Sequence, residues 1–538
     1  MTEPTHRVGA NTDMSWNAWG DPAQATSLPE SVRGLVGEVL GAPLRPSPGV
    51  EAEELVLPPC ALPDAARTAL ESVLGAEHVR TDDGARVLHT GGKSTPDLLR
   101  RRAGDVEAAP DAVLLPADHA EVEAVLRACA EHAVAVVPFG GGTSVVGGVE
   151  PLRGRFGALV ALDLRRLDRL VDVDDVARTA TLQAGLRTPR AEELLAAHGL
   201  TLGHQPQSYE YATIGGYAAT RSSGQSSAGY GRFEAMVLSL RVATPSGTLD
   251  LGRSPGSAAG PDLRQLLLGS EGTLGVITEV TLRVRPRPAE QLDEAWSFPD
   301  FATGTAALRA VAQSGVRPTL VRLSDETETF VNSALSGEEA VPGCLAVIAH
   351  EGEAGQVAAL RELTAATLRA AGGTELGTEP VAHWRHSRYS GPYLRDALLG
   401  AGVLAETLET ATTWSNLPKL RQAVTEALTG TLTTDGKPPV VNCHISHVYP
   451  EGASLYFTVV AAAGDDPLAR WLRAKRSAGD AIAACGATIS HHHAVGADHL
   501  PWMEAEIGGL GLEVLRAVKG VLDPTGILNP GKLIPERP

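Results

Sequence analysis

The stretch Val136–Gly148, VVPFGGGTSVVGG, decides how the rest of the chain is interpreted. The apolar run over 132–137 predicts a short buried strand, which Pro138 ends because proline has no N–H to donate. Three glycines follow, and consecutive glycines let successive backbone N–H groups converge on an anion. A pyrophosphate is the ligand that we expect such a loop to bind. The alternative is a glycine-rich turn between strands, since neither a helix-opening GxGxxG nor a P-loop lysine is present.

Three further stretches favour the pyrophosphate interpretation: His204–Gly224, Gly269–Thr278 and Leu522–Lys532. Together with the glycine-rich loop, and in this order, they resemble the FAD-binding domain of the vanillyl-alcohol oxidase / p-cresol methylhydroxylase family. The resemblance implies an α+β fold in which FAD lies between two α+β subdomains, with a separate cap domain over its ring. Taken singly, each stretch could be a polar turn. Because all four occur together and in the order of the family, that interpretation is improbable.

The same resemblance assigns the cofactor-binding residues. Gly215 and Gly216 let the backbone approach a flat ring, Thr220 and Ser222 offer hydroxyls, and Arg221 offers positive charge near a reduced flavin. Because Pro138–Gly148 contains neither His nor Cys, we expect FAD to be bound non-covalently. The predicted set is Pro138, Phe139, Gly140, Gly141, Gly142, Thr143, Ser144, Gln207, Ser208, Thr213, Gly215, Gly216, Ala219, Thr220, Arg221, Ser222, Glu271, Gly272, Thr273, Leu274, Gly275, Val276 and Ile277.

Length and charge set further bounds. With 538 residues, two or three domains are expected, and a net charge of -18 argues against nucleic-acid binding. The five scattered cysteines argue against disulfides or a zinc site and fit a reducing compartment. No apolar run approaches the roughly 20 residues of a membrane span, and the start of the chain has no apolar signal core. We therefore expect a cytoplasmic protein.

Composition shifts suggest four parts. Residues 1–75 form an N-terminal docking segment with helices, and its two close tryptophans, Trp16 and Trp19, would pack on the body. Residues 76–288 form the FAD-binding domain, which the Arg-Pro-Arg-Pro run closes. Residues 289–500 form an α+β cap domain, predicted as an antiparallel sheet with helices on one face. Residues 501–538 return to the FAD-binding domain.

The most unusual local feature is Ser490–Gly496, SHHHAVG. Three adjacent histidines can bind a metal, relay protons, or form an exposed polar turn. In a strand, His491 and His493 would share one face and His492 the other, so three ligands to one metal would be awkward. We therefore predict that no metal binds here and favour general acid–base catalysis or stabilisation of an oxyanion.

This segment also sharpens the resemblance. Six stretches resemble motifs of the alkyldihydroxyacetonephosphate synthase family: MSWNAWG (14–20), VRLSD (321–325), YLRD (393–396), LETATTW (408–414), SLYF (454–457) and SHHHAVG. That family exchanges the acyl chain of acyl-dihydroxyacetone phosphate for a long-chain alcohol, with covalent participation of FAD and no net redox change. The likeness covers essentially the whole chain, although Ala494 stands where the family has glycine and no peroxisomal address is seen.

The resemblance implies roles for these residues. Tyr456 assists proton removal from the substrate, and His491, His492 and His493 activate the alcohol or stabilise charge. As a base near neutral pH, a phenol needs positive charge or hydrogen-bond donors nearby, which His491 or His493 and Arg322 could supply. Arg395 binds the substrate phosphate and Arg322 supports the site. Without the family, Tyr456 could simply pack and each arginine could form a surface ion pair. A homodimer and a peripheral membrane contact stay open. The alternative functions are an FAD-dependent dehydrogenase or oxidase of a 2-hydroxy acid or alcohol, and a non-catalytic flavin-binding protein.

Overall fold

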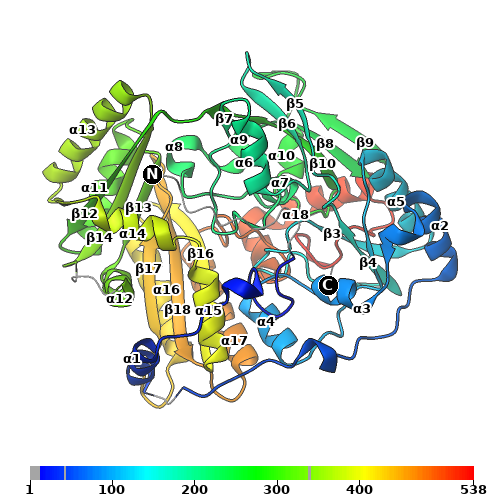
Figure 1. Ribbon diagram of the computed structural model, residues 1–538, viewed down its shortest axis with the longest axis horizontal. Helices are drawn as coiled ribbons and strands as arrows, with labels where there is room; N and C mark the ends of the chain where they lie inside the picture. The colour runs from blue at the N-terminus through cyan, green and yellow to red at the C-terminus, as the bar shows by residue number, and fades with distance from the viewer. Residues whose placement is uncertain (1–12, 42–43, 337–340, 538) are drawn as a thin grey trace.

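The computed structural model describes residues 13–41, 44–336 and 341–537 (Figure 1). Two sheets at the right of Figure 1 make up the half that carries the glycine-rich loop, and one large sheet at the left makes up the other half. The α+β architecture with a large antiparallel sheet in the C-terminal half confirms the predicted fold class.

Four strands of the described chain form the first sheet, in the order β1-β2-β4-β3. β2, β4 and β3 are parallel, and β1 pairs antiparallel with β2. Its elements are β1 (Val79–Arg80), α3 (Asp83–Leu88), α4 (Thr95–Arg102), β2 (Ala112–Leu114), α5 (His119–Glu131), β3 (Val134–Phe139) and β4 (Ala158–Asp163), preceded by α1 (Glu30–Leu40) and α2 (Asp64–Leu74).

The predicted strand end at Pro138 is wrong, because β3 continues to Phe139 and Pro138 pairs with Leu162. The Val136 N–H points away from β4 and donates to Ile527 at 2.9 Å. Alternation places the Pro138 nitrogen on that same outer side of an edge strand, so the missing N–H removes no bond to β4.

The second sheet is antiparallel throughout, with the described strands in the order β5-β6-β10-β8-β9. Within it, β8 (Val237–Thr244) and β9 (Gly247–Leu251) form a hairpin. The other elements of this region are β5 (Leu170–Asp174), β6 (Thr179–Gln183), α6 (Thr188–Ala196), β7 (Leu200–Thr201), α7 (Ile214–Thr220), α8 (Ser227–Tyr230), α9 (Phe233–Met236), α10 (Arg264–Leu267), β10 (Val276–Arg283) and β11 (Arg285–Pro286).

Seven strands within the described residues form the cap sheet, in the order β15-β12-β14-β13-β17-β18-β16, with every neighbour antiparallel. Its elements are β12 (Glu290–Phe298), α11 (Phe301–Gln313), β13 (Leu320–Ser324), α12 (Glu326–Ser336), β14 (Cys344–Gly352), α13 (Ala354–Ala370), β15 (Thr374–Gly377), α14 (Glu379–Ser387), α15 (Gly391–Gly400), β16 (Val403–Thr413), α16 (Leu417–Leu432), β17 (Val440–Ile445), β18 (Gly452–Ala462) and α17 (Pro467–Ala484).

Strand alternation divides this sheet into two faces. Trp296, Leu323 and Phe457 lie on one face, in a core that α11, α13, α16 and α17 cover. The prediction that helices cover one face only is wrong, because α14 and α15 pack on the opposite face near its ends, against Ala349 and Ala405. The polar residues of that second face, between these two helices, form the candidate site.

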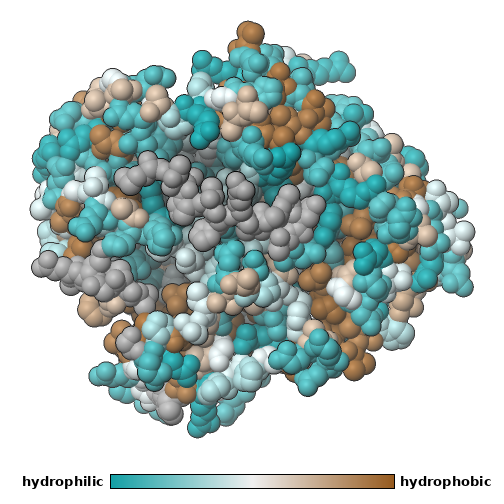
Figure 2. All heavy atoms as spheres, in the orientation of Figure 1, coloured by the Kyte–Doolittle hydropathy of each residue, from teal (hydrophilic) through white to brown (hydrophobic). Residues whose placement is uncertain are grey.

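The terminal segments pack onto both halves. Trp19 is buried against Tyr211 and Tyr393, with its ring 5.9 Å from that of Tyr211. After α18 (Met503–Leu522), the tail pairs with β3, where Asn529 donates to the Val136 carbonyl at 2.8 Å. In the part of the chain that is described, no helix is long and apolar enough to cross a membrane. Hydrophilic and apolar residues are interspersed over the face shown in Figure 2.

Candidate active site

A row of three side chains crosses the cap sheet. His444 on β17 pairs directly with Tyr456 on β18, and Tyr456 pairs with Glu409 on β16. All three lie on the face opposite the apolar core, because alternation places Cys443, Phe457 and Leu408 in that core. The His444 and Tyr456 rings are stacked with centroids 4.8 Å apart. The sheet therefore supplies a rigid row of an imidazole, a phenol and a carboxylate.

The histidine segment is a loop that wraps around the Glu409 carboxylate. Backbone N–H groups of His491, His492 and His493 donate to Glu409 at 2.7, 3.1 and 2.9 Å, and the Ser490 hydroxyl donates at 2.8 Å. Consecutive N–H groups converging on one anion form a nest. Burial alone would raise the pKa of Glu409, but the neighbouring histidines and these hydrogen bonds hold it well below its ordinary value. The predicted strand alternation of the histidines is therefore wrong, since the loop follows the carboxylate.

A second carboxylate holds the other end of the loop. Glu271, from the GSEGTLG stretch, accepts hydrogen bonds from the Val495 N–H at 3.1 Å and the Gly496 N–H at 2.8 Å. Burial raises the pKa of Glu271 to about 7. The histidine loop is thus attached to the cap sheet by Glu409 and to the predicted cofactor region by Glu271.

Between these two attachments the chain reverses at Ala494, whose φ is 73°. This left-handed conformation explains why glycine is expected at that position, since a Cβ costs about 1 kcal/mol or more there.

Replacing Ala494 by glycine is expected to raise the free energy of unfolding by about 1 kcal/mol, because the strain at a positive φ is removed. Urea titration followed by tryptophan fluorescence measures the change. Ala25→Gly is the matched control, because the φ of Ala25 is -57° and glycine relieves nothing there. A loss of stability in Ala494→Gly would contradict the interpretation.

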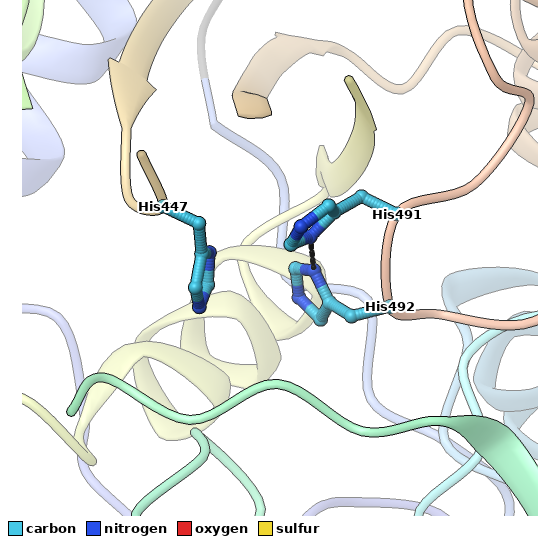
Figure 3. A group of neighbouring side chains, drawn as sticks. All are labelled: His447, His491 and His492. Atoms are coloured by element: carbon cyan, nitrogen blue, oxygen red, sulfur yellow. Dashed lines mark hydrogen bonds between the residues drawn. The ribbon is translucent and has the colours of Figure 1, made fainter. Parts of the chain in front are cut away.

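The histidines form a compact buried group, which Figure 3 shows with His447 facing His491 and His492. His491 Nε2 lies 2.6 Å from the Tyr449 hydroxyl, and its Nδ1 lies 3.1 Å from His492 Nδ1. Burial lowers the pKa of His447 and His492 to about 3 and that of His493 to about 4. These rings are therefore neutral near pH 7, which argues against a positive charge from His491 or His493 beside Tyr456 and does not test the alternative, hydrogen-bond donation.

Neutral imidazoles can also bind metal ions. One ring nitrogen from each of His447, His491 and His492 lies within 4.8 Å of the others, close enough for ligands of a single ion. Two of these rings already have other partners, because His447 Nε2 lies 3.0 Å from the Gly224 carbonyl and His491 Nε2 meets Tyr449. The prediction that no metal binds here stays a prediction.

Arg322 is paired within the site. Its guanidinium donates to Glu328 at 3.0 Å and to His444 Nε2 at 3.0 Å, while His444 Nδ1 lies 2.9 Å from Glu328. Burial would raise the pKa of Glu328, but His444 and Arg322 lower it well below its ordinary value. Arg322 therefore fixes the orientation of the His444 ring that stacks on Tyr456.

Tyr456 itself is a neutral phenol. Burial raises its pKa to about 12 even though Arg322 and the hydrogen bond to Thr407 lower it. Its hydroxyl donates to Thr407 Oγ1 at 3.0 Å. The His492 and His493 rings lie 6.0 and 5.7 Å from the Tyr456 ring, so the predicted tyrosine and histidines do come together.

Arg395 lies in a different group of contacts. It donates to the Asp396 carboxylate at 3.0 Å and to the Lys93 carbonyl at 2.6 Å, and the Lys93 N–H in turn donates to the Ser144 carbonyl. The structure thus places Arg395 beside the glycine-rich loop, with no contact to the tyrosine row.

The three predicted cofactor stretches meet in space. Both Gly140 and Gly141 are required, because a Cβ at Gly140 would come within 2.5 Å of Thr213 Oγ1 and a Cβ at Gly141 within 2.0 Å of the Tyr211 carbonyl oxygen. A Cβ at Gly272 would come within 2.7 Å of Pro138 Cγ. Residues 214–220 form the helix α7, which is capped by Thr213 Oγ1 accepting from the Gly216 N–H.

The remaining predicted cofactor residues have mixed environments. Thr220 Oγ1 donates to the Gly216 carbonyl, and Ser222 Oγ lies 3.0 Å from His204 Nε2. Arg221 turns toward the end of α10, donating to the Leu268 carbonyl at 2.9 Å and to Gln265. The predicted charge near a reduced flavin is therefore engaged in fixing α10.

The residues present fit FAD. In the described part of the chain, several buried polar atoms without hydrogen-bond partners fall in the predicted cofactor stretches, namely Ser223 Oγ, Ser270 Oγ, Thr273 Oγ1 and Asn529 Oδ1. Buried polar groups normally have partners, so these atoms are suited to receive the polar edges of a bound ligand.

Sequence reasoning missed several residues of the site. Glu409, His444, His447, Tyr449 and Glu328 were not singled out, although Glu409 lies within the quoted LETATTW stretch. One signal was available: two glutamates, Glu406 and Glu409, within the strand Val403–Thr413. A buried carboxylate needs dedicated donors, so it marks a built site.

Comparison with known proteins agrees with this geometry. Residues 110–251 match the family described as FAD binding domain, and residues 287–533 match FAD linked oxidases, C-terminal domain. An alkyldihydroxyacetonephosphate synthase from Trypanosoma brucei brucei is 32% identical, with 98% of this chain and 93% of the relative covered. A mitochondrial D-lactate dehydrogenase [cytochrome] from Arabidopsis thaliana is 28% identical, with 79% of this chain and 74% of the relative covered.

Solved structures point the same way. A structure described as alkyldihydroxyacetonephosphate synthase superposes with a TM-score of 0.83 and 31% identity, over 97% of this chain and 99% of the other. A p-cresol methylhydroxylase structure has a TM-score of 0.70 at 16% identity, over 88% of this chain and 98% of the other, which shows the shared fold. The chain therefore belongs to the alkyldihydroxyacetonephosphate synthase-like FAD-linked oxidases, and it shares its fold with p-cresol methylhydroxylase.

Proposed function

We propose that this protein exchanges the acyl group of acyl-dihydroxyacetone phosphate for a long-chain alcohol. The bond between the substrate carbon and the carboxylate oxygen breaks, and the fatty acid leaves. The alcohol oxygen forms the new ether bond to that carbon, and the alcohol proton is released. No electrons are gained or lost overall, so no external oxidant is required.

The observation that carries this proposal is the convergence of Tyr456 and the histidine loop on one face of the cap sheet, attached through Glu271 to the cofactor stretch. The relatives of 30% identity or more that support it are named alkyldihydroxyacetonephosphate synthases. The D-lactate dehydrogenase likeness keeps hydroxy-acid oxidation as the second candidate.

Different side chains carry out the two proton transfers, one from the substrate carbon and one from the alcohol. A neutral phenol can take a proton from the substrate carbon only while it hands on its own, so Tyr456 acts as a relay: its proton passes to Thr407 Oγ1, and the Thr407 hydroxyl proton passes to solvent water. His492 or His493, neutral at pH 7, accepts the alcohol proton as the ether bond forms. Glu409 lies 3.6 and 4.0 Å from their Nδ1 atoms and stabilises the imidazolium.

FAD would be held by the glycine-rich loop, the N-terminal end of α7 and the 269–277 stretch, whose buried Ser270 and Thr273 hydroxyls have no hydrogen-bond partner among the described residues. When bound, it supplies the electrophilic ring that reacts with the substrate carbon. We assign Arg395 to the substrate phosphate, because a guanidinium beside the glycine-rich loop can bind a phosphate in bidentate fashion.

Flavin absorbance under anaerobic conditions tests the function. Bleaching by acyl-dihydroxyacetone phosphate that is reversed on adding hexadecanol, with release of ether product, is expected. Bleaching by D-lactate that is reversed only by an electron acceptor would establish the dehydrogenase instead. Absence of any response to either substrate would reduce the chain to a flavin-binding protein.

We further expect that acid precipitation releases FAD into the supernatant, because the loop Pro138–Gly148 offers no histidine or cysteine for a covalent bond. The flavin absorbance of the supernatant and of the dissolved pellet measures the partition. The bound flavin should appear in the supernatant almost completely. Yellow colour that stays with the pellet would contradict non-covalent attachment and point to a residue outside the loop.

A further inference from the structure

We propose that a cavity between α11 and α16 of the cap domain is an effector site for a small carboxylic acid with an apolar body. The cavity has a volume of about 600 Å³, within the range of pockets that hold small molecules. Val441 on β17 lines it and alternates onto the same, helix-covered face of the sheet as Cys443. The cavity is therefore separate from the row of His444, Tyr456 and Glu409, which lies on the opposite face.

One face of each helix forms the walls of the cavity. The lining residues include two sets that are spaced four apart, as on one side of an α-helix: Phe301, Thr305 and Arg309 on α11, and Leu417, Arg421 and Thr425 on α16. Phe301, Trp414 and Leu417 also belong to the apolar core of the cap and are at most 7% exposed. The inner wall is thus apolar and aromatic, and it can take up the apolar body of a ligand.

The hydrogen-bonding groups left open in the cavity are donors. The Arg421 guanidinium lies 4.5 Å from the centre of the Phe301 ring and donates through Nη2 to Asp325 at 3.0 Å. Its buried Nε and the buried Thr305 hydroxyl have no hydrogen-bond partner among the described residues. Arg309 is exposed and forms no ion pair within the described part of the chain. Two guanidinium groups and a hydroxyl are suited to bind a carboxylate.

The acidic groups that line the cavity already have donors. Asp325 accepts from the Cys443 N–H and the Glu328 N–H, each at 2.8 Å, in addition to Arg421. Glu426 is exposed and accepts from the Gln422 amide at 2.8 Å. The group that the cavity lacks is therefore an acceptor, which favours an acidic ligand over a basic one.

Asp325 connects the cavity to the candidate active site. Cys443, whose N–H it accepts, immediately precedes His444, and the carboxylate of Glu328 lies 2.9 Å from His444 Nδ1. A ligand carboxylate that binds the Arg421 guanidinium would weaken its bond to Asp325 and loosen this support. Occupancy of the cavity is thus coupled to the row on the other face of the sheet.

Isothermal titration calorimetry of the holoenzyme with 2-naphthoate tests the site. Saturable binding with one site per chain is expected. Ala306→Phe should abolish it, because Ala306 lines the cavity and is exposed on α11, so a larger side chain fills the space without disturbing the core. Ala310→Phe is the matched control, because Ala310 is exposed one turn further along α11 and does not line the cavity. It should bind 2-naphthoate as the wild type does.

The carboxylate is tested separately. Arg309→Met should weaken 2-naphthoate binding about ten- to hundredfold, because a charge-assisted hydrogen bond is lost. Arg317→Met is the control, because Arg317 is an exposed arginine outside the cavity lining. The neutral 2-naphthamide should bind the wild type as weakly as 2-naphthoate binds Arg309→Met.

Three results would overturn the proposal. Absence of saturable binding, or equal binding in the wild type and Ala306→Phe, would remove the site, and equal affinity for 2-naphthoate and 2-naphthamide would remove the carboxylate. Under turnover, saturating 2-naphthoate should lower kcat severalfold in the wild type and not in Ala306→Phe; an unchanged wild-type kcat, or inhibition that persists in Ala306→Phe, would remove the coupling through Asp325. Binding is measured without turnover, so it does not depend on the proposed exchange reaction.

Discussion

Glu409→Gln is expected to lower kcat at least a hundredfold and the free energy of unfolding by about 3 kcal/mol. The carboxylate accepts from three consecutive backbone N–H groups and a hydroxyl, and the amide nitrogen of glutamine cannot accept. The histidine loop must then move, or leave N–H groups unpaired. The negative charge that would stabilise an imidazolium on His492 is also lost.

Steady-state kinetics and urea unfolding measure these two effects separately. The KM for the phosphate-bearing substrate should change little, because Arg395 is untouched. Glu294→Gln is the control, because Glu294 is a buried carboxylate on β12 of the same sheet, paired with Arg361 and without contact to the loop. It should lose stability and keep kcat. Equal losses of kcat in the two variants would reduce Glu409 to a purely structural role.

Tyr456→Phe is expected to lower kcat by about 10² to 10⁴, with FAD occupancy and folding unchanged. The ring keeps its stacking on His444, and only the hydroxyl that bonds Thr407 is removed. The relay of the substrate proton is then broken at its first atom. Rapid-mixing absorbance should show that acyl-dihydroxyacetone phosphate no longer bleaches the flavin at the wild-type rate.

Tyr230→Phe is the matched control, because it also removes a phenol that forms a hydrogen bond, here 2.6 Å to Glu351, outside the row. It should bleach normally. Bleaching at the wild-type rate in Tyr456→Phe would remove the tyrosine from the chemistry and leave it a packing residue between His444 and His492.

Local chemistry made much of the fold predictable. Three stretches bring the backbone close to other groups: the glycine-rich loop, the 213–224 stretch and the GSEGTLG stretch. Each contains a short run of small residues, which allows such an approach and can be recognised in the sequence. The hairpin at 237–251 follows from alternation around Pro245–Gly247. Such patterns involve only residues that are neighbours in sequence, so they can be recognised without knowledge of the tertiary structure.

Other predictions failed because they depend on distant partners. Pro138 was expected to end its strand, but its nitrogen lies on the outer side of an edge strand. The histidines were expected to alternate as in a strand, but the Glu409 carboxylate, more than 80 residues earlier, draws their N–H groups to one point. The position of Arg221 near a flavin stays a prediction, but the carbonyls of Gln265 and Leu268 accept hydrogen bonds from its guanidinium, which the sequence did not indicate.

The sequence by itself, through its resemblance to a known family, determined the fold class and made the predicted flavin-binding stretches, Tyr456, Arg322, Arg395 and the three histidines candidates, because motif order is a property of the chain. Only the tertiary structure decided that His444, Tyr456 and Glu409 form one row, since strand register joins residues from three separate strands. It also decided that the histidines are neutral, since burial, and not sequence, lowers their pKa values.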